Sequence, residues 1–302
     1  MQWIWCLVLL QASLSYAAGG RRGEVFEVHG HRGARAREPE NTLPAFEHAL
    51  NGGANVLEAD VGVSKDGHLV LNHDFEVNTK LCRSASPGLK NANHPLVNSL
   101  TLAQLKTYDC GSAYDAEFPE RKIRPGARIL TLGEFLDWLN RTPNPAGRLV
   151  RLNLETKIES AHPGKTVAPR VFVDMIAREL KKHRISANRV ILQSFDFRTI
   201  VYAKKKYPQY QTSALVEGDS LDVEKIWEQT RANYISPDAN LLNKEKVRQA
   251  HALGMQVVPW TLNKSLHWGH FRMMGVDGII TDDPAALVRY LNPPKSGLKS
   301  RP

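Results

Sequence analysis

The stretch Asn55-Val56-Leu57-Glu58-Ala59-Asp60-Val61 sets two carboxylates within an otherwise apolar run of this 302-residue chain. Side chains two positions apart on a β-strand point to the same face, so Glu58 and Asp60 project together. The valine and leucine residues around them are typical of a buried strand. Because every second residue of a barrel strand faces the interior, this stretch predicts an interior pair of carboxylates.

Eight further short apolar runs lie along the chain, with helical patterns between most of them. Strands that alternate with helices indicate βαβ units and a mainly parallel sheet. The nine runs cover residues 25–28, 55–61, 69–72, 149–155, 190–193, 212–216, 234–236, 256–260 and 278–281. The turn Lys65-Asp66-Gly67 is too short for a crossover helix and predicts a hairpin between the second and third runs. Eight strands remain, enough to close a (β/α)8 barrel, a fold of about 250 residues.

The interval from Phe75 to Gly147 interrupts the alternation and is rich in Asn, Ser, Pro and Gly in its first part. Helical periodicity over residues 100–108 and 132–139 predicts a partly ordered cap over one end of the barrel. The expected organisation is therefore an α/β domain at residues 24–292 that carries an insertion at 75–128, followed by a disordered tail at 293–302. On length alone, two small domains would also be possible.

The N-terminus has the features of an export signal. Residues 3–14 are mostly apolar, and Ser15-Tyr16-Ala17 fits the small-x-small pattern of a signal peptidase site, although no Lys or Arg precedes the apolar stretch. We expect a signal peptide at residues 1–17 and a periplasmic or secreted protein. A membrane anchor is the alternative, but the stretch is short for a bilayer span, and stable membrane insertion is not expected.

The net charge of +9 comes from Lys and Arg residues spread along the chain, without a long basic run. This distribution does not favour nucleic-acid binding, whereas a positive field suits a small anionic substrate. The mature chain would retain Cys82 and Cys110, since Cys6 would leave with the signal peptide. In an oxidising compartment this pair could form a disulfide or remain as two thiols, and the sequence indicates no oligomeric state.

Barrel enzymes place reactive side chains at the C-terminal ends of their strands, where several polar residues occur here. Together with Glu58 and Asp60, Glu155 at the end of a later run offers three hard oxygen donors, which suit Ca²⁺ or Mg²⁺. His31 and His73 each end an apolar run beside a charged residue. Because the ordinary pKa of histidine lies near neutrality, the two could serve as acid and base in cleaving a phosphodiester.

Two basic residues follow these groups and could contact a phosphate. Arg32 comes directly after His31, and a planar guanidinium matches two phosphate oxygens. Lys157 could supply a second positive charge to the developing anion. Trp260, at the end of the eighth run, could stack on the substrate or pack in the core.

The order and spacing of these motifs resemble the glycerophosphodiester phosphodiesterase family over roughly residues 28 to 290. The opening signature and its later matches are His31-Arg32-Gly33, Pro39-Glu40-Asn41-Thr42, Leu57-Glu58-Ala59-Asp60-Val61, Lys65-Asp66-Gly67, His73-Asp74, Glu155-Thr156-Lys157, Gln193-Ser194-Phe195, Trp260-Thr261-Leu262-Asn263 and the segment Asp277 to Pro284. The resemblance implies a distorted TIM barrel with an insertion after the third strand.

The resemblance also implies a reaction and a set of roles. The reaction converts a glycerophosphodiester, a deacylated phospholipid, into sn-glycerol 3-phosphate and an alcohol. The implied roles are acid and base for His31 and His73, phosphate binding for Arg32 and Lys157, and ligation of one divalent cation for Glu58, Asp60 and Glu155. The chain departs from the family pattern at His29, where an apolar or small residue is expected, and at Gly62-Val63-Ser64.

Three other functions are compatible with parts of the pattern. His29-Gly30-His31 could hold a metal as in amidohydrolases, but later runs end in Ser194 and Pro237 instead of further histidines. A phospholipase of the D-type toxin kind would share the two histidines and the carboxylates, yet the insertion is polar. A non-catalytic exported binding protein for such diesters would not need both histidines.

Overall fold

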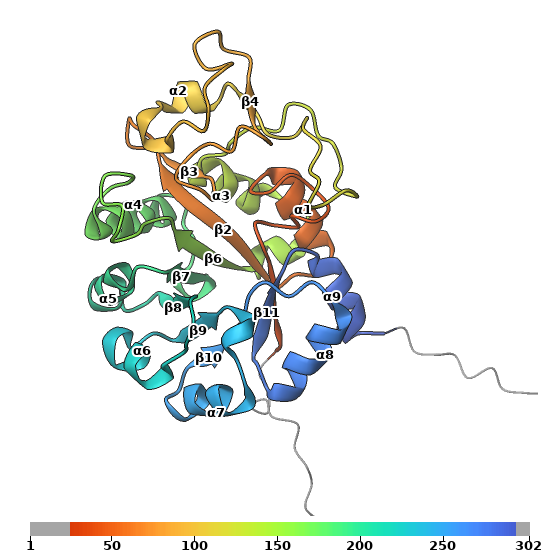
Figure 1. The fold of residues 1–302 in the computed structure, drawn as a ribbon, viewed down its shortest axis with the longest axis vertical. Coiled ribbons are helices and arrows are strands. Elements are labelled where there is room, and N and C mark those ends of the chain that lie inside the picture. Colours follow the sequence, from red (N-terminus) through yellow and green to blue (C-terminus); the bar gives the residue numbers. More distant parts are fainter. Residues whose placement is uncertain (1–24, 294–302) are drawn as a thin grey trace, which may run out of the picture.

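The structure, a computed structural model, describes residues 25–293. Eight parallel strands form a curved sheet in the order β10-β9-β8-β7-β6-β2-β1-β11. They are β1 (Glu27–Gly30), β2 (Val56–Val63), β6 (Arg151–Thr156), β7 (Val190–Ser194), β8 (Gln211–Val216), β9 (Tyr234–Pro237), β10 (Gln256–Val257) and β11 (Gly278–Thr281). Helices surround them (Figure 1), as predicted for a TIM-type barrel.

The barrel closes between β10 and β11 through backbone hydrogen bonds and not through a regular ladder. The Asp277 N–H donates to Val257 O at 2.9 Å, and the Ile280 N–H donates to Pro259 O at 3.0 Å. Pro259 has no N–H to return, so the regular ladder is interrupted there, and the next bond across the seam is from the Leu262 N–H to Ile280 O at 3.0 Å. For this reason the strand predicted at 256–260 is only two residues long, and the barrel is distorted at this seam.

The predicted hairpin is confirmed. Strand β3 (Leu69–Leu71) runs antiparallel to β2, with Val61 opposite Leu71, and lies outside the eight-stranded path. After β3 the chain has returned to the middle of β2, where the Asn72 N–H donates to Asp60 O at 3.1 Å. The hairpin thus brings the residue that follows, His73, back to the level of the β2 carboxylates.

Apart from one short helix of the insertion, the helices pack their apolar faces against the outside of the strands. They are α1 (Leu43–Asn51), α2 (Leu102–Leu105), α3 (Leu132–Arg141), α4 (Pro169–Lys182), α5 (Phe197–Lys206), α6 (Val223–Thr230), α7 (Lys244–Ala252), α8 (Ser265–Met274) and α9 (Pro284–Leu291), with 3₁₀ turns η1 (Val97–Ser99), η2 (Pro145–Arg148), η3 (Ala187–Arg189) and η4 (Ala239–Leu241). A smaller apolar cluster lies inside the barrel, with Val56, Ile191, Val258 and Ile280 among its members.

The segment between β3 and α3 holds η1, α2 and a two-stranded sheet of β4 (Arg83–Ser84) and β5 (Tyr108–Asp109). It projects beyond β3 in Figure 1. The helix predicted at 132–139 is present as α3. The one predicted at 100–108 is wrong in its length, because Tyr108 pairs with Ser84 in the small sheet and ends the helical stretch.

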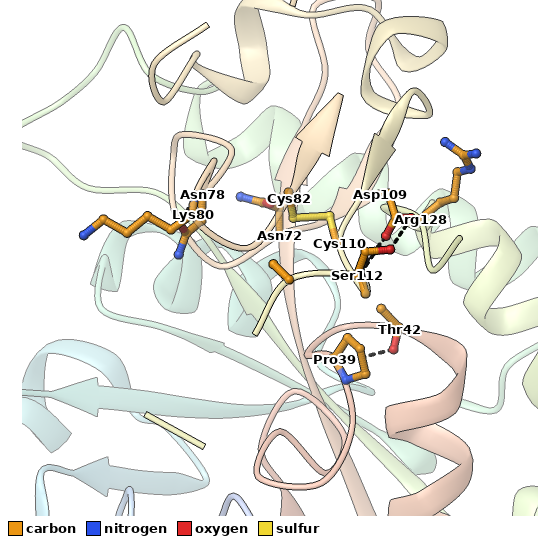
Figure 2. Close-up of a disulfide and its surroundings, with 12 residues drawn as sticks. Pro39, Thr42, Asn72, Asn78, Lys80, Cys82, Asp109, Cys110, Ser112 and Arg128 are labelled. Carbon is orange, nitrogen blue, oxygen red and sulfur yellow. Dashed lines mark hydrogen bonds between the residues drawn. A yellow bond between two sulfur atoms is a disulfide. The ribbon is translucent and has the colours of Figure 1, made fainter. Parts of the chain in front are cut away.

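A disulfide joins Cys82 to Cys110 and closes this segment. The two cysteines flank the β4–β5 pair, and Figure 2 shows the bond, which lines a small cavity together with Asn72. Both cysteines are largely buried among apolar residues of the insertion. The sequence alone left this pair as either bridged or free.

The predicted signal peptide at 1–17 and residues 294–302 of the predicted tail lie outside the described residues. Within residues 25–293 no helix is both long enough and apolar enough to cross a membrane.

Removal of the disulfide is expected to destabilise the protein. A bond between residues 28 positions apart constrains the unfolded chain by about 3 to 4 kcal/mol in the loop-closure estimate. The Cys82→Ala/Cys110→Ala variant should therefore unfold at a lower denaturant concentration than the wild type under oxidising conditions. Reductant should lower the wild-type midpoint and leave that of the double variant unchanged. Equal midpoints for the two oxidised proteins would contradict the prediction.

Candidate active site

A cavity of about 360 Å³ opens at the C-terminal ends of the barrel strands. Its volume falls in the range typical of small-molecule sites. Seven of the eight predicted site residues line it, namely His31, Arg32, Glu58, His73, Glu155, Lys157 and Trp260. The eighth, Asp60, is 0 % exposed and contacts Arg32 from below the cavity surface.

Three carboxylates meet at the base of this cavity. One oxygen each of Glu58, Asp60 and Glu155 lies within 4.8 Å of the other two. Strands β2 and β6 pair in parallel with Asp60 directly opposite Glu155, and all three side chains are buried. The interior carboxylate pair expected from the spacing on β2 is therefore present, and β6 adds the third member.

The pKa shifts of the cluster reflect the repulsion between three buried carboxylates. Burial and the charges of Asp60 and Glu155 raise the pKa of Glu58 well above its usual value. Burial and Asp60 also raise the pKa of Glu155, although Lys157 opposes the rise. Burial disfavours the charge on Asp60 too, but His73, Arg32 and Lys157 outweigh it and hold the pKa of Asp60 low. A bound cation would relieve this repulsion.

The donor set fits a hard divalent cation. Asp60 Oδ1 is buried and has no hydrogen-bond partner, while Asn41 Nδ2 donates to Asp60 Oδ2 at 2.9 Å. One carboxylate oxygen is therefore left free to act as a ligand. Oxygen donors are what Ca²⁺ and Mg²⁺ bind, and among the described residues this is the one cluster of acids, histidines or cysteines with such spacing.

Arg32 is bound on two sides. It adopts a left-handed conformation with φ of 50°, and its backbone N–H donates to Glu58 Oε2 at 2.7 Å. Its guanidinium Nη1 donates to both oxygens of Glu40, at 3.0 and 2.9 Å, and Nε lies 3.3 Å from Asp60 Oδ2. Burial opposes the positive charge, but Glu40 and Asp60 raise the pKa of Arg32, so the guanidinium stays charged.

Lys157 lies on the other side of the carboxylates. Its ammonium donates to Glu155 Oε1 at 2.6 Å and lies 3.8 Å from Asp60 Oδ1. Despite burial, these two carboxylates raise the pKa of Lys157. Both predicted phosphate-binding residues thus present charge to the cavity while paired with protein carboxylates.

His31 is held in one orientation by a buried carboxylate. Its Nδ1 lies 2.6 Å from Asp282 Oδ1, and the ring is 13 % exposed. Asn263 fixes Asp282 in turn, since Asn263 Nδ2 donates to Asp282 Oδ2 at 2.7 Å and the Asp282 N–H donates to Asn263 Oδ1 at 2.9 Å. Because a carboxylate only accepts, Nδ1 carries the proton and Nε2 is free to accept one.

The environment keeps His31 neutral. Burial and the positive charge of Arg32 lower the pKa of His31, and Asp282 only partly offsets them. Asp282 itself stays ionised, because His31 and Arg35 outweigh burial and lower the pKa of the Asp282 carboxyl. His31 is therefore poised to take up a proton at neutral pH.

His73 is the more accessible of the two histidines, with 33 % of its side chain exposed. Its Nδ1 lies 2.7 Å from Asp74 Oδ1, so it repeats the pairing of histidine with carboxylate. His73 reaches the cavity because the β2–β3 hairpin returns the chain to the level of Asp60.

An apolar wall faces the polar groups across the cavity. Trp260 and Phe195 pack edge to face with ring centroids 5.7 Å apart, and both line the cavity. The Trp260 indole N–H donates to Ser236 O at 2.8 Å, which anchors the ring to β9. Trp260 therefore both packs in the barrel and presents a face to the cavity.

Several residues of the site had no role assigned from the sequence. Glu40 binds Arg32, Asn41 orients Asp60, and Asn263 orients Asp282. Gln193 Nε2 donates to Glu58 Oε1 at 3.1 Å. All of these residues stand within the motifs quoted above, so position in a motif was the available signal, but no spacing rule assigns their contacts.

The structure argues against the amidohydrolase arrangement. His29 does not turn toward the carboxylate cluster, since its ring nitrogens contact Glu27 and Asn153 deeper in the barrel. Within residues 25–293, the one group of side chains spaced closely enough to share a metal consists of three carboxylates and contains no histidine.

Relatives of known structure share this fold. A crystal structure from Silicibacter pomeroyi DSS-3 superposes with a TM-score of 0.80 at 27% identity, covering 91% of this chain and 95% of that one. The crystal structure of glycerophosphodiester phosphodiesterase from Thermotoga maritima superposes with a TM-score of 0.62 at 25% identity, covering 88% of this chain and 99% of that one.

Curated sequences named glycerophosphodiester phosphodiesterase also align with most of this chain. A glycerophosphodiester phosphodiesterase of Bacillus subtilis (strain 168) is 29% identical, with 84% of this chain and 82% of that protein aligned. One from Caldanaerobacter subterraneus subsp. tengcongensis is 28% identical, with 87% and 97% aligned. The sequence model of the glycerophosphoryl diester phosphodiesterase family matches residues 31–286, which include every predicted site residue. The chain therefore belongs to the glycerophosphoryl diester phosphodiesterase family.

Proposed function

We propose that this enzyme hydrolyses glycerophosphodiesters to sn-glycerol 3-phosphate and an alcohol, in a reaction that depends on a divalent cation and on His31 and His73. The observation that carries the proposal is the shared cavity, where two carboxylate-paired histidines face three clustered acids. Phosphodiester cleavage needs a base, an acid and positive charge at the phosphoryl oxygens, and this cavity offers a candidate for each.

Glu58, Asp60 and Glu155 would hold the cation. When bound, Ca²⁺ or Mg²⁺ supplies charge that neutralises phosphoryl oxygens and lowers the pKa of a coordinated hydroxyl group. The three residues contribute a buried, preassembled ligand set, and the free Oδ1 of Asp60 is part of it. Arg32 and Lys157 would add charge around the phosphate, because each has more N–H donors than its carboxylate partners use.

We assign the two proton transfers to the two histidines. His31 is the base, since its lowered pKa leaves Nε2 unprotonated and Asp282 stabilises the positive ring that forms. His73 is the acid that protonates the departing oxygen, and Asp74 would steady its charged form. The bond from phosphorus to the alcohol oxygen breaks, a hydroxyl oxygen takes its place, and one water is consumed.

We also propose that the protein is exported, to the periplasm or the medium. The supporting observations are the signal-like residues 1–17 and the Cys82–Cys110 disulfide, because structural disulfides persist in oxidising compartments.

Glycerol 3-phosphate release from glycerophosphocholine tests the proposed reaction. EDTA should abolish the release, and added Ca²⁺ or Mg²⁺ should restore it. His31→Ala should lower kcat by about 10² to 10⁴-fold, the usual contribution of a positioned acid or base. His68→Ala is the matched control, since His68 is exposed on the β2–β3 turn and lies outside the cavity lining. Metal-independent release, or full activity in His31→Ala, would refute the proposal.

The pH dependence tests the assignment of His31 as base. A base acts in its neutral form, so a lowered pKa should place the acid limb of kcat/KM below the ordinary histidine value of about 6.5. Asp282 raises the pKa of His31, so Asp282→Asn should move the acid limb to still lower pH at saturating metal. It should also reduce kcat by about 10³ to 10⁴-fold, because the tautomer is no longer fixed.

The neighbouring Asp283→Asn is the matched control for this experiment. Asp283 caps α9 and pairs with Arg37, so its replacement should leave the acid limb in place. An acid limb that stays at the wild-type pH in Asp282→Asn would assign the limb to a group other than His31.

A further inference from the structure

A chain of buried polar side chains runs through the barrel interior to Glu58, and the proposed reaction does not use it. Its members in order are Glu27, His29, Asn153, Gln193 and Glu58. We propose that His29 is a positioning residue, which acts through Asn153 and Gln193 to hold the Glu58 carboxylate in the orientation that binds the cation. This inference rests on the metal site of the proposed function.

The link nearest the site holds both oxygens of Glu58. Gln193 Nε2 donates to Oε1 at 3.1 Å, and the Arg32 N–H donates to Oε2 at 2.7 Å. Two donors on one buried carboxylate fix its plane and favour its ionised form. The arrangement requires Gln193 to present its NH₂ group to Glu58, since the amide oxygen would repel the carboxylate.

The second link fixes the orientation of Gln193. Asn153 Nδ2 donates to Gln193 Oε1 at 2.8 Å, so the Gln193 oxygen is turned away from Glu58. The same Nδ2 lies 3.3 Å from His29 Nδ1. Both hydrogens of the Asn153 amide are thus used, one on each neighbour.

The third link fixes the orientation of Asn153. His29 Nε2 lies 2.7 Å from Glu27 Oε2, and the ring is 1 % exposed. Glu27 is ionised, because its contacts to His29 and Arg151 outweigh burial and lower the pKa of the Glu27 carboxyl. A carboxylate only accepts, so the His29 proton lies on Nε2 and its Nδ1 must accept from Asn153.

A fixed charge at one end therefore sets the direction of every bond along the chain. The Asn153 Oδ1 atom is buried without a partner, so this direction is kept although it leaves one acceptor unsatisfied. A buried unpaired acceptor costs about 1 to 3 kcal/mol. Apolar residues such as Val56 and Ile191 occupy neighbouring interior positions. The barrel interior therefore accepts apolar side chains, and packing alone does not require polar ones here.

Without His29, the hydrogen-bond directions of Asn153 and Gln193 would no longer be fixed. Asn153 could then turn its oxygen toward Gln193, whose amide would follow and present Oε1 to Glu58. The Glu58 carboxylate would rotate away or take up a proton, and either change removes a ligand from the site. Residues that orient metal ligands typically change metal affinity by about 10 to 100-fold.

Calorimetric titration of the metal-free protein with Ca²⁺ alone, and with Mg²⁺ alone, tests the inference without any substrate. His29→Leu should weaken binding of the preferred ion about 10 to 100-fold. His29→Gln should stay within about threefold of the wild type, because a glutamine can accept from Asn153 and donate to Glu27. Ser213→Ala is the matched control, since Ser213 stands beside Gln193 in the same barrel but its hydroxyl bonds Ser236 and makes no hydrogen bond to any of the five side chains.

Asn153→Ala removes the middle link of this hydrogen-bond chain and should weaken metal binding to the same extent. This variant provides the test if His29→Leu does not fold. Wild-type affinity in either folded variant would overturn the inference, as would a His29→Gln protein as weak as His29→Leu. If the wild type binds neither ion, the metal site of the proposed function fails and this inference fails with it. If the wild type binds and His29→Leu binds equally, only the inference fails.

Discussion

The mutual repulsion of three buried carboxylates is the constraint around which the rest of the site is arranged. Glu58, Asp60 and Glu155 lie too close together to be ionised without compensation, and burial raises that penalty. Arg32 and Lys157 supply part of the compensation through ion pairs. A bound cation would supply the remainder, so the same geometry that makes the three charges costly suits the cluster to a metal.

The barrel topology brings these charges together from distant parts of the chain. Parallel strands end at one face, so β2 and β6 deliver their carboxylates side by side although about 95 residues separate them in the sequence. The hairpin after β2 turns the chain back and places His73 at the same level. The pairing of β1 with β11 then sets Asp282 beside His31, 251 positions away.

Local patterns predicted the parts of the site that lie on single strands. The spacing of Glu58 and Asp60, the turn before β3 and the polar ends of the strands are local features, and the structure brings most of the residues predicted from them to one cavity. Contacts such as Asp282 with His31 depend on which strand closes the barrel, a long-range outcome that periodicity does not encode. The helix predicted at 100–108 was overestimated for a similar reason, because pairing of Tyr108 with Ser84 overrode its helical pattern.

The two histidines occupy unequal surroundings, and this inequality favours different roles. His31 is hydrogen-bonded to Asp282, which is in turn hydrogen-bonded to Asn263. Asp282 and Asn263 follow β11 and β10, so the barrel fixes both the orientation and the tautomer of the His31 ring. His73 follows the β2–β3 hairpin, just before the insertion, and lines a small cavity together with the Cys82–Cys110 disulfide. The fixed ring of His31 would suit the proposed base, which must take a proton from one defined position. Under the proposed roles, the accessible position of His73 would suit an acid that protonates leaving alcohols of different size, so variation in the neighbouring insertion would alter the alcohol that is accepted without disturbing His31 or the three carboxylates.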